Sequence, residues 1–400
     1  MRKNKPIWLL GVGACFISIH AYAVDASEAP TPGTGDIIQR FADHALIKNK
    51  LSVVVEQNYF DWQNDQGDSG RQTITPVTFA YRHEGFDFGL RRAYIDSVNS
   101  TANRQGSVST WSDTSLSAAY TFQKLAWPVR INIDYNLPNG KAGLAGAEKN
   151  AIMDGALVQQ TRFGEGENIA LGVGVTHAFS EQNIFGGGLS FLKRGVFSPN
   201  SDIANTALDL GDDTIVTLQW QHSAQNWMVI GGLIYTQSDV TQRGGLDYYK
   251  KGDRTDVNLT GIYAISSTQK IQANLRYSTQ SQDRYLNSLG TLQQESANSN
   301  GDSTYLNLDW SKTWEGKHTL HVLADSLEIT ANSYDQVNDL YNAGRNKFGV
   351  GLGYDYAFTP KSRISLVFKT YEMKDKATPA TLRDTKYTGN NVYINISHTF

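Results

Sequence analysis

The chain has 400 residues, of which 40% are hydrophobic, and 36 Lys and Arg against 39 Asp and Glu give a formal net charge of −3. Neither a basic patch nor an acidic tail is present, which excludes nucleic-acid binding as a function. Cys15 is the only cysteine, so disulfides and cysteine-based metal sites are excluded, and the sequence predicts neither a metal nor another cofactor.

The N-terminus predicts a cleaved secretory signal peptide over residues 1–23. Arg2, Lys3 and Lys5 form a positive region, an apolar stretch covers 7–19, and Ala21-Tyr22-Ala23 supplies small residues around the cleavage point. The apolar stretch is short for a membrane helix, which needs about 20 residues. A lipoprotein signal with lipidation at Cys15 is the alternative. An apolar stretch that continues beyond Cys15 favours the signal peptide.

Residues 24–50 predict a periplasmic spacer followed by a short helix. Pro30, Pro32 and Gly33 indicate an irregular lead-in, and apolar residues at helical spacing follow Asp36. This segment is either a periplasmic tail or a small plug for the lumen of the domain that follows.

From Leu51 to Phe400 the apolar residues recur at every second position, for example in 129–137, 270–277 and 347–358. One apolar and one polar face is the pattern of antiparallel strands. Short turns alternate with long polar loops, as in outer-membrane barrels. The pattern predicts an all-β fold: a transmembrane antiparallel up-and-down β-barrel of about 16 strands, with bounds of roughly 14 to 18. Residues 108–122 are predicted as one strand.

A soluble β-sandwich or propeller also alternates, and the mean hydropathy of −0.41 permits one. A barrel, however, needs only an apolar outer face, because its lumen is polar. Aromatic residues gather near the short turns, where a membrane-interface belt is expected. These residues are Tyr81, Phe86, Phe122, Trp127, Phe179, Phe185, Trp227, Trp314 and Phe358.

The face opposite the apolar one is expected to line a water-filled lumen. Both signs of charge occur on it, which is compatible with a transverse field across a pore and also with inert ion pairs. The lumen-lining candidates are Glu56, Asp87, Arg91, Arg130, Asp134, Lys270, Arg276, Asp309 and Asp355.

One connection, residues 138–167, is longer than the rest and contains six glycines. It is either an ordinary extracellular loop or a loop that folds inward and narrows the channel. The constriction candidates in it are Lys141, Glu148, Lys149, Asp154 and Arg162.

The C-terminal residues resemble the last strand of outer-membrane barrels, which ends in Phe and is recognised by the barrel-assembly machinery. Ile394, Ile396 and Phe400 share one face at period two, and they are the assembly-signal candidates. His398 stands where that pattern usually has an aromatic residue.

The sequence gives little support for an enzyme. A hydrolase built on one strand face needs Ser and His two positions apart, and no such pair occurs in residues 24–400. His222 with Ser223 and Ser397 with His398 are adjacent, so each pair points to opposite faces. The prediction is therefore a protein without enzymatic activity.

Residues 112–140 resemble outer-membrane proteins of the meta-pathway phenol-degradation family. The resemblance lies in Ser112-Asp113-Thr114-Ser115-Leu116, in Tyr120 and Phe122, and in Leu137-Pro138-Asn139-Gly140. It covers under a tenth of the chain, and Ser112 and Asn139 depart from the family's Gly and Thr. The resemblance implies a channel, with aromatic or other apolar small molecules as solutes, whereas the polar lumen candidates favour hydrophilic ones.

The sequence as a whole predicts a channel of the Gram-negative outer membrane, with both chain ends in the periplasm. Small solutes would diffuse passively through a polar lumen narrowed by residues 138–167. The alternative is a non-conducting barrel with a plugged lumen that serves a structural or docking role. The expected partners are outer-membrane lipids and lipopolysaccharide, the barrel-assembly machinery and a small-molecule solute. The solute and the oligomeric state are not predicted.

Overall fold

The computed structural model describes residues 50–203 and 207–400. The predicted signal peptide and nearly all of the predicted spacer therefore lie outside the described residues. No helix within the described ranges is long and apolar enough to cross a membrane. One 3-10 helix, η2, covers Gly146–Ala151.

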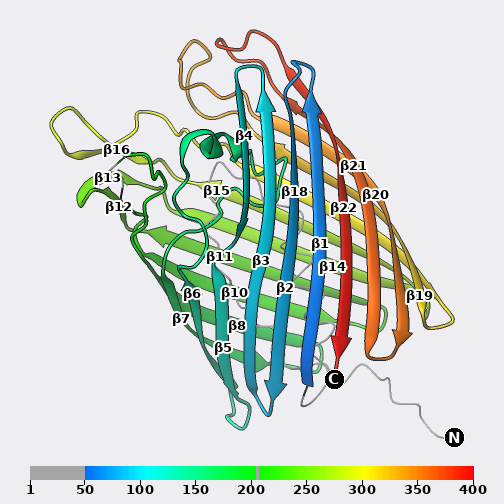
Figure 1. Cartoon of the computed structure of the whole chain (residues 1–400). Coiled ribbons are helices and arrows are strands. Elements are labelled where there is room, and N and C mark those ends of the chain that lie inside the picture. The colour runs from blue at the N-terminus through cyan, green and yellow to red at the C-terminus, as the bar shows by residue number, and fades with distance from the viewer. Residues whose placement is uncertain (1–49, 204–206) are drawn as a thin grey trace, which may run out of the picture.

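A closed antiparallel sheet forms the body of the molecule (Figure 1). Over the described residues it contains β1 (Lys50–Asn64), β2 (Ser69–His83), β3 (Phe86–Thr101), β4 (Arg104–Trp111), β5 (Thr114–Phe122), β6 (Val129–Leu137), β7 (Asn168–Ala178), β8 (Asn183–Arg194), β10 (Asp213–Ser223), β11 (Trp227–Ser238), β14 (Arg254–Ser266), β15 (Gln269–Gln280), β18 (Ser303–Trp314), β19 (His318–Ile329), β20 (Arg345–Thr359), β21 (Ser362–Asp375) and β22 (Thr385–Thr399).

The described part of the chain thus forms a 16-strand barrel wall, because β4 and β5 follow each other along β3 and share one position. The pairing of β1 with β22 closes the barrel, and the amide of Phe400 donates to the carbonyl of Leu51. Both the predicted fold class and the predicted strand number are confirmed. One detail of the prediction was wrong: residues 108–122 are interrupted at Ser112 and Asp113.

The polar face of the strands points into the barrel. Arg130 on β6 pairs with Asp87 on β3 across β5, and Lys369 on β21 pairs with Asp325 on β19 across β20. Side chains of strands two positions apart meet most readily on the concave side of a curved sheet, which is the lumen. The alternate positions, such as Phe348 at 58% exposure, face outward.

Aromatic side chains form a band on the outer surface at the rim of short turns. The rings of Trp127, His177, Phe179 and Phe185 follow each other at centroid distances of 4.5, 4.7 and 5.2 Å. At the opposite rim, outward tyrosines donate their hydroxyls to the acid that precedes the next strand: Tyr135 to Glu167, Tyr235 to Asp253 and Tyr277 to Asp302. Two such bands are what a membrane-spanning wall requires at its two interfaces.

The long loops gather at the rim opposite the C-terminus (Figure 1). Five short strands of the described residues form a second sheet there. They are β9 (Leu208–Asp209), β12 (Val240–Arg243), β13 (Leu246–Lys250), β16 (Arg284–Leu286) and β17 (Leu292–Gln294).

Candidate functional site

A β-bulge interrupts the wall strand formed by β4 and β5. Tyr94 of β3 lies opposite Trp111, whereas Arg91 lies opposite Ser115. Two residues of β3 therefore face the three residues 112–114. An extra residue shifts the inward–outward alternation by one position. Asp113 is consequently buried on the lumen side rather than turned towards lipid.

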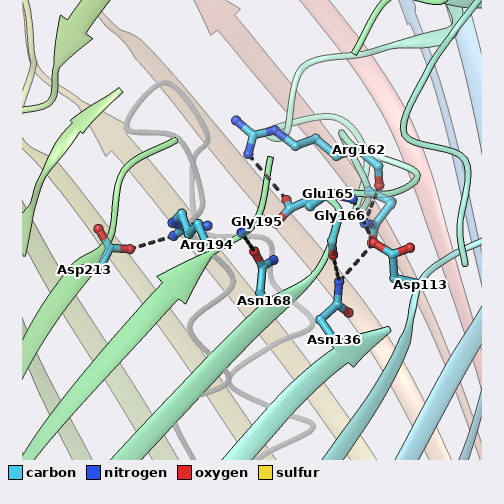
Figure 2. A network of polar contacts seen from close by, with 10 residues as sticks. Asp113, Asn136, Arg162, Glu165, Gly166, Asn168, Arg194, Gly195 and Asp213 are labelled. Atoms are coloured by element: carbon cyan, nitrogen blue, oxygen red, sulfur yellow. Dashed lines mark hydrogen bonds and ion pairs between the residues drawn. The ribbon is translucent and has the colours of Figure 1, made fainter. Parts of the chain in front are cut away.

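The carboxylate of Asp113 holds both ends of the loop 138–167. It accepts a hydrogen bond from the backbone amide of Gly140 at 2.6 Å. It also accepts hydrogen bonds from the backbone amide of Glu165 at 2.8 Å and from Asn136 Nδ2 at 3.0 Å (Figure 2). A Cβ atom at Gly140 would lie 2.4 Å from the backbone nitrogen of Asp113, so the approach requires glycine. The carboxylate thus closes the loop at its base.

The two segments that carry the family resemblance meet at this point. Asp113 contacts Gly140, and both the amide and the hydroxyl of Thr114 donate to Asn139 Oδ1, at 2.9 and 3.1 Å. The resemblance therefore marks one structural unit, the bulge and the start of the loop. Membership of the phenol-degradation family itself stays a prediction.

The base of the loop is also tied to the neighbouring strands (Figure 2). Asn136 donates to the carbonyl of Gly166 at 2.9 Å, and Arg162 pairs with Glu165 at 3.4 Å. On the next strands, a buried ion pair joins Arg194 and Asp213 at 2.6 Å.

The loop 138–167 has an apolar core of its own that packs on the inner wall. Ala151, Met153, Ala156, Leu157, Val158 and Phe163 are buried against inward-facing side chains of β1, β2, β3, β4, β19 and β21. Those wall residues are Phe60, Trp62, Ile74, Ile95, Val108, Leu327, Tyr371 and Met373. Burial of this apolar surface favours the inward position of the loop.

Polar contacts extend the attachment of the loop along the wall. Ser97 on β3 donates to the carbonyl of Ala151 at 3.0 Å. Gln72 on β2 exchanges two hydrogen bonds with Gln160, at 2.7 and 2.9 Å.

The far end of the loop reaches β20. Arg345 Nη1 lies 2.7 Å from Asp154, and Lys347 Nζ donates to the carbonyl of Ala156 at 2.5 Å. Six wall positions separate β6 from β20, if β4 and β5 are counted as one position. The others are those of β3, β2, β1, β22 and β21. Because a 16-strand barrel is closed, strands so far apart lie nearly opposite each other. The loop 138–167 therefore has contacts on both of these sides of the barrel, with Asp113 near β6 and with Arg345 on β20.

All the lumen-lining candidates lie on the inward face, and most are engaged by other residues. Asp87 pairs with Arg82 and Arg130. Asp256 holds Arg254 and Arg276, each at 2.9 Å. His321 lies between Asp309 and Asp355, at 3.0 and 3.5 Å. Glu56 accepts a hydrogen bond from Asn395, and Asp134 accepts one from Asn132.

The constriction candidates divide into two groups. Lys141 pairs with Glu148, and Lys149 pairs with Asp202 of the loop between β8 and β10 at 2.7 Å, so these three contact loop residues. Asp154 reaches the far wall, and Arg162 lines the pocket described next.

A pocket lies between the returning limb of the loop and the wall formed by β2 to β8. Gln159, Arg162 and Phe163 line it from the loop, and Arg91 and Asp134 are among the wall residues that line it. Both charged and apolar side chains line this pocket, which lies next to the loop.

Several site residues escaped the sequence reasoning. Asp113 was quoted only for a family resemblance, because the bulge that turns it inward leaves no clear mark in the sequence. Phe60, Trp62 and Ile95 point inward against the rule that inward residues are polar. The signal that was available is the apolar run 151–158 inside an otherwise polar loop, which predicts a buried contact for that loop.

The closed wall, its outward apolar face and its two aromatic bands define the class: the chain is a transmembrane β-barrel.

Similar solved structures belong to that class. They include a TodX monoaromatic hydrocarbon channel lacking S2S3 (11% identity, 89% of this chain and 92% of that chain covered, TM-score 0.45) and the CymD monoaromatic hydrocarbon channel (11%, 88% and 89%, 0.44). Pseudomonas aeruginosa OpdQ is a third (10%, 88% and 100%, 0.42). Similarity at this level carries no argument about a solute. No family model and no curated protein matches the sequence.

Proposed function

We propose that the chain is an outer-membrane channel through which small solutes diffuse passively, with the loop 138–167 narrowing a polar lumen. One observation supports the proposal: the loop is attached to inward-facing residues at both ends of its course, at its base by Asp113 and at its far end by Arg345. A loop held in this way leaves a restricted passage beside it, and a restricted polar passage selects by size and charge.

The membrane location and the partners belong to the same proposal. The outward apolar face would contact outer-membrane lipids and, at the rim of long loops, lipopolysaccharide. Ile394, Ile396 and Phe400 would serve as the signal for the barrel-assembly machinery. In support, Ile396 and Phe400 are exposed on the outer surface at 52% and 59%.

A second candidate function is a non-conducting docking barrel. It is favoured by the second sheet at the loop rim, where Leu246 and Tyr285 are exposed. Exposed apolar side chains on extracellular loops suit contact with a partner.

Single-channel conductance of residues 24–400, refolded into a planar bilayer, separates the two functions. A shortened chain that begins at Leu51 is measured beside it. Steady conductance of the longer chain supports the channel. If only the shortened chain conducts, residues 24–50 act as a plug. If neither chain conducts, the channel function is contradicted and the docking function is favoured.

A further inference from the structure

Arg91 differs from the other inward-facing arginines in its surroundings. Its neighbours on the lumen face are Gly89 and Ala93 along β3, Thr78 on β2 and Ser115 on β5. None of these neighbours carries a charge, and all are small. Within residues 50–203 and 207–400, no hydrogen bond or ion pair engages the guanidinium of Arg91. The small neighbours leave space above the guanidinium, and the pocket beneath the loop occupies that space.

The carboxylates that line the same pocket already hold donors. Asp113 accepts from two backbone amides and from Asn136. Glu165 pairs with Arg162, and Asp134 has an amide donor in Asn132 together with a further interaction. Among the charged side chains that line the pocket, Arg91 is thus the one that no hydrogen bond or ion pair engages within the described residues.

The wall next to the pocket adds positive charge. Four residues before Arg91 on the same face, the single carboxylate of Asp87 is shared by two guanidinium groups, those of Arg82 and Arg130. An anion that approaches Arg91 along this wall therefore meets an excess of positive charge, which raises its local concentration.

Apolar side chains also line the pocket. Ile74, Phe163 and Leu192 line it together with the small side chains of Ala93 and Ala170. A solute with a compact apolar body would gain contact there.

We propose that the pocket beneath the loop is a binding subsite for small organic anions, in which Arg91 pairs with the anionic group and Ile74, Phe163 and Leu192 contact the apolar body. The proposal rests on the channel function and names its solute class. Guanidinium binds a carboxylate through two parallel hydrogen bonds. The anionic group would therefore be held against β3 while the body of the solute lies along the loop.

The test uses three fluorinated probes of one shape and different charge: 4-fluorobenzoate, 4-fluorobenzamide and the cation 4-fluorobenzamidine. Binding to refolded residues 24–400 in micelles is followed by fluorine NMR line broadening, and conductance is recorded from the same preparation. The variants are Arg91→Gln, Arg91→Lys and, as a matched control, Lys270→Gln, which removes an inward cation from β15. A heat-dependent shift in gel mobility verifies that each variant is folded.

We expect the benzoate to bind more tightly than the amide, and the amide more tightly than the amidine. Arg91→Gln should weaken benzoate binding about tenfold or more, the usual effect of losing a hydrogen bond to a charged group. Arg91→Lys should restore part of it, and Lys270→Gln should leave it within about twofold.

Equal binding of the three probes, or unchanged benzoate binding by folded Arg91→Gln, would overturn the subsite. The probe comparison on the native chain decides the matter even where a variant does not fold. Conductance without this difference in probe binding would contradict the proposed subsite and support the channel function. The expected binding without any conductance would support the proposed subsite and contradict the channel function.

Discussion

Two long loop regions of this barrel differ in where their apolar side chains lie. The loop 138–167 folds into the lumen, and its apolar side chains are buried, with Val158 at 1% exposure. The segments 239–253 and 281–302 pair with each other in the second sheet outside the wall. Their apolar side chains remain exposed, with Leu289 at 85%.

The difference shows what directs a loop inward. Loop 138–167 has an apolar run that only Asp154 and Gly155 interrupt, and an anchor that bonds to both of its ends. The inner wall next to it carries matching apolar side chains. In the second sheet, isolated apolar residues alternate with polar ones. Pairing between its short strands supplies hydrogen-bond partners for the backbone N–H and C=O groups. Length and glycine content, by contrast, are similar in the two regions.

The largest effect is expected from a charge placed in the apolar run. Val158→Asp buries an unpaired carboxylate, which costs about 3 kcal/mol or more and should detach the loop from the wall. The chain 24–400 has no cysteine, so Ala156→Cys, a buried position, supplies a reporter. Maleimide labelling of this cysteine should become at least about tenfold faster.

The matched control is Leu289→Asp in the turn between β16 and β17 of the second sheet, where the added charge stays in water. Its labelling rate at Ala156→Cys should equal that of the parent. If both aspartates accelerate labelling equally, the contrast between the two loop regions is wrong.

A smaller effect is expected when the anchor is removed. Asp113→Ala loses three hydrogen bonds to a carboxylate but adds no buried charge. Because the apolar contacts remain, the loop should open part of the time rather than detach. Single-channel records should show a higher mean conductance and more open-channel noise. The control, Asp247→Ala, removes a carboxylate that accepts a single side-chain hydrogen bond in the second sheet and should leave the records unchanged.

The smallest effect is expected from pH. A hydrogen bond from Lys141 and the backbone amide of Ala145 lower the pKa of Glu148, and Lys149 with the amide of Gly146 lowers the pKa of Asp202. A carboxyl whose pKa is lowered on folding stabilises the fold above its ordinary pKa and loses that effect as pH falls through the lowered value. These loop contacts should therefore weaken below about pH 4.

Open-channel noise recorded between pH 7 and pH 3 measures this weakening. Asp202→Asn should show at neutral pH part of the noise that the native chain shows only in acid. An identical pH profile for the two proteins would exclude Asp202 from the effect.

The barrel itself was predictable because each wall strand repeats one simple rule. A strand with a period-two pattern, such as 347–358, has one face for lipid and one for water. Its two faces can be assigned from the local sequence without reference to any distant residue. The short turns then fix the order of the strands, and the even strand number follows.

The contents of the lumen were less predictable, because they depend on residues that meet across the barrel. Asp154 and Arg345 are 191 positions apart, and nothing local to either residue indicates the pair. Asp113 points inward only because a bulge shifts the alternation. Trp62 shares the inward face of β1 with Glu56, and its burial there depends on Met153, which covers it. Pattern analysis of single segments does not contain such information.

The contact between Asp154 and Arg345 also bears on the order of events during folding. The loop emerges early in synthesis, whereas its partner on β20 belongs to the last quarter of the chain, and β1 is paired on both edges only when β22 arrives. Contacts of such sequence separation form late. We expect the loop to settle in its final place only as the seam between the first and last strands closes, so that insertion into the membrane and completion of the passage occur in one step.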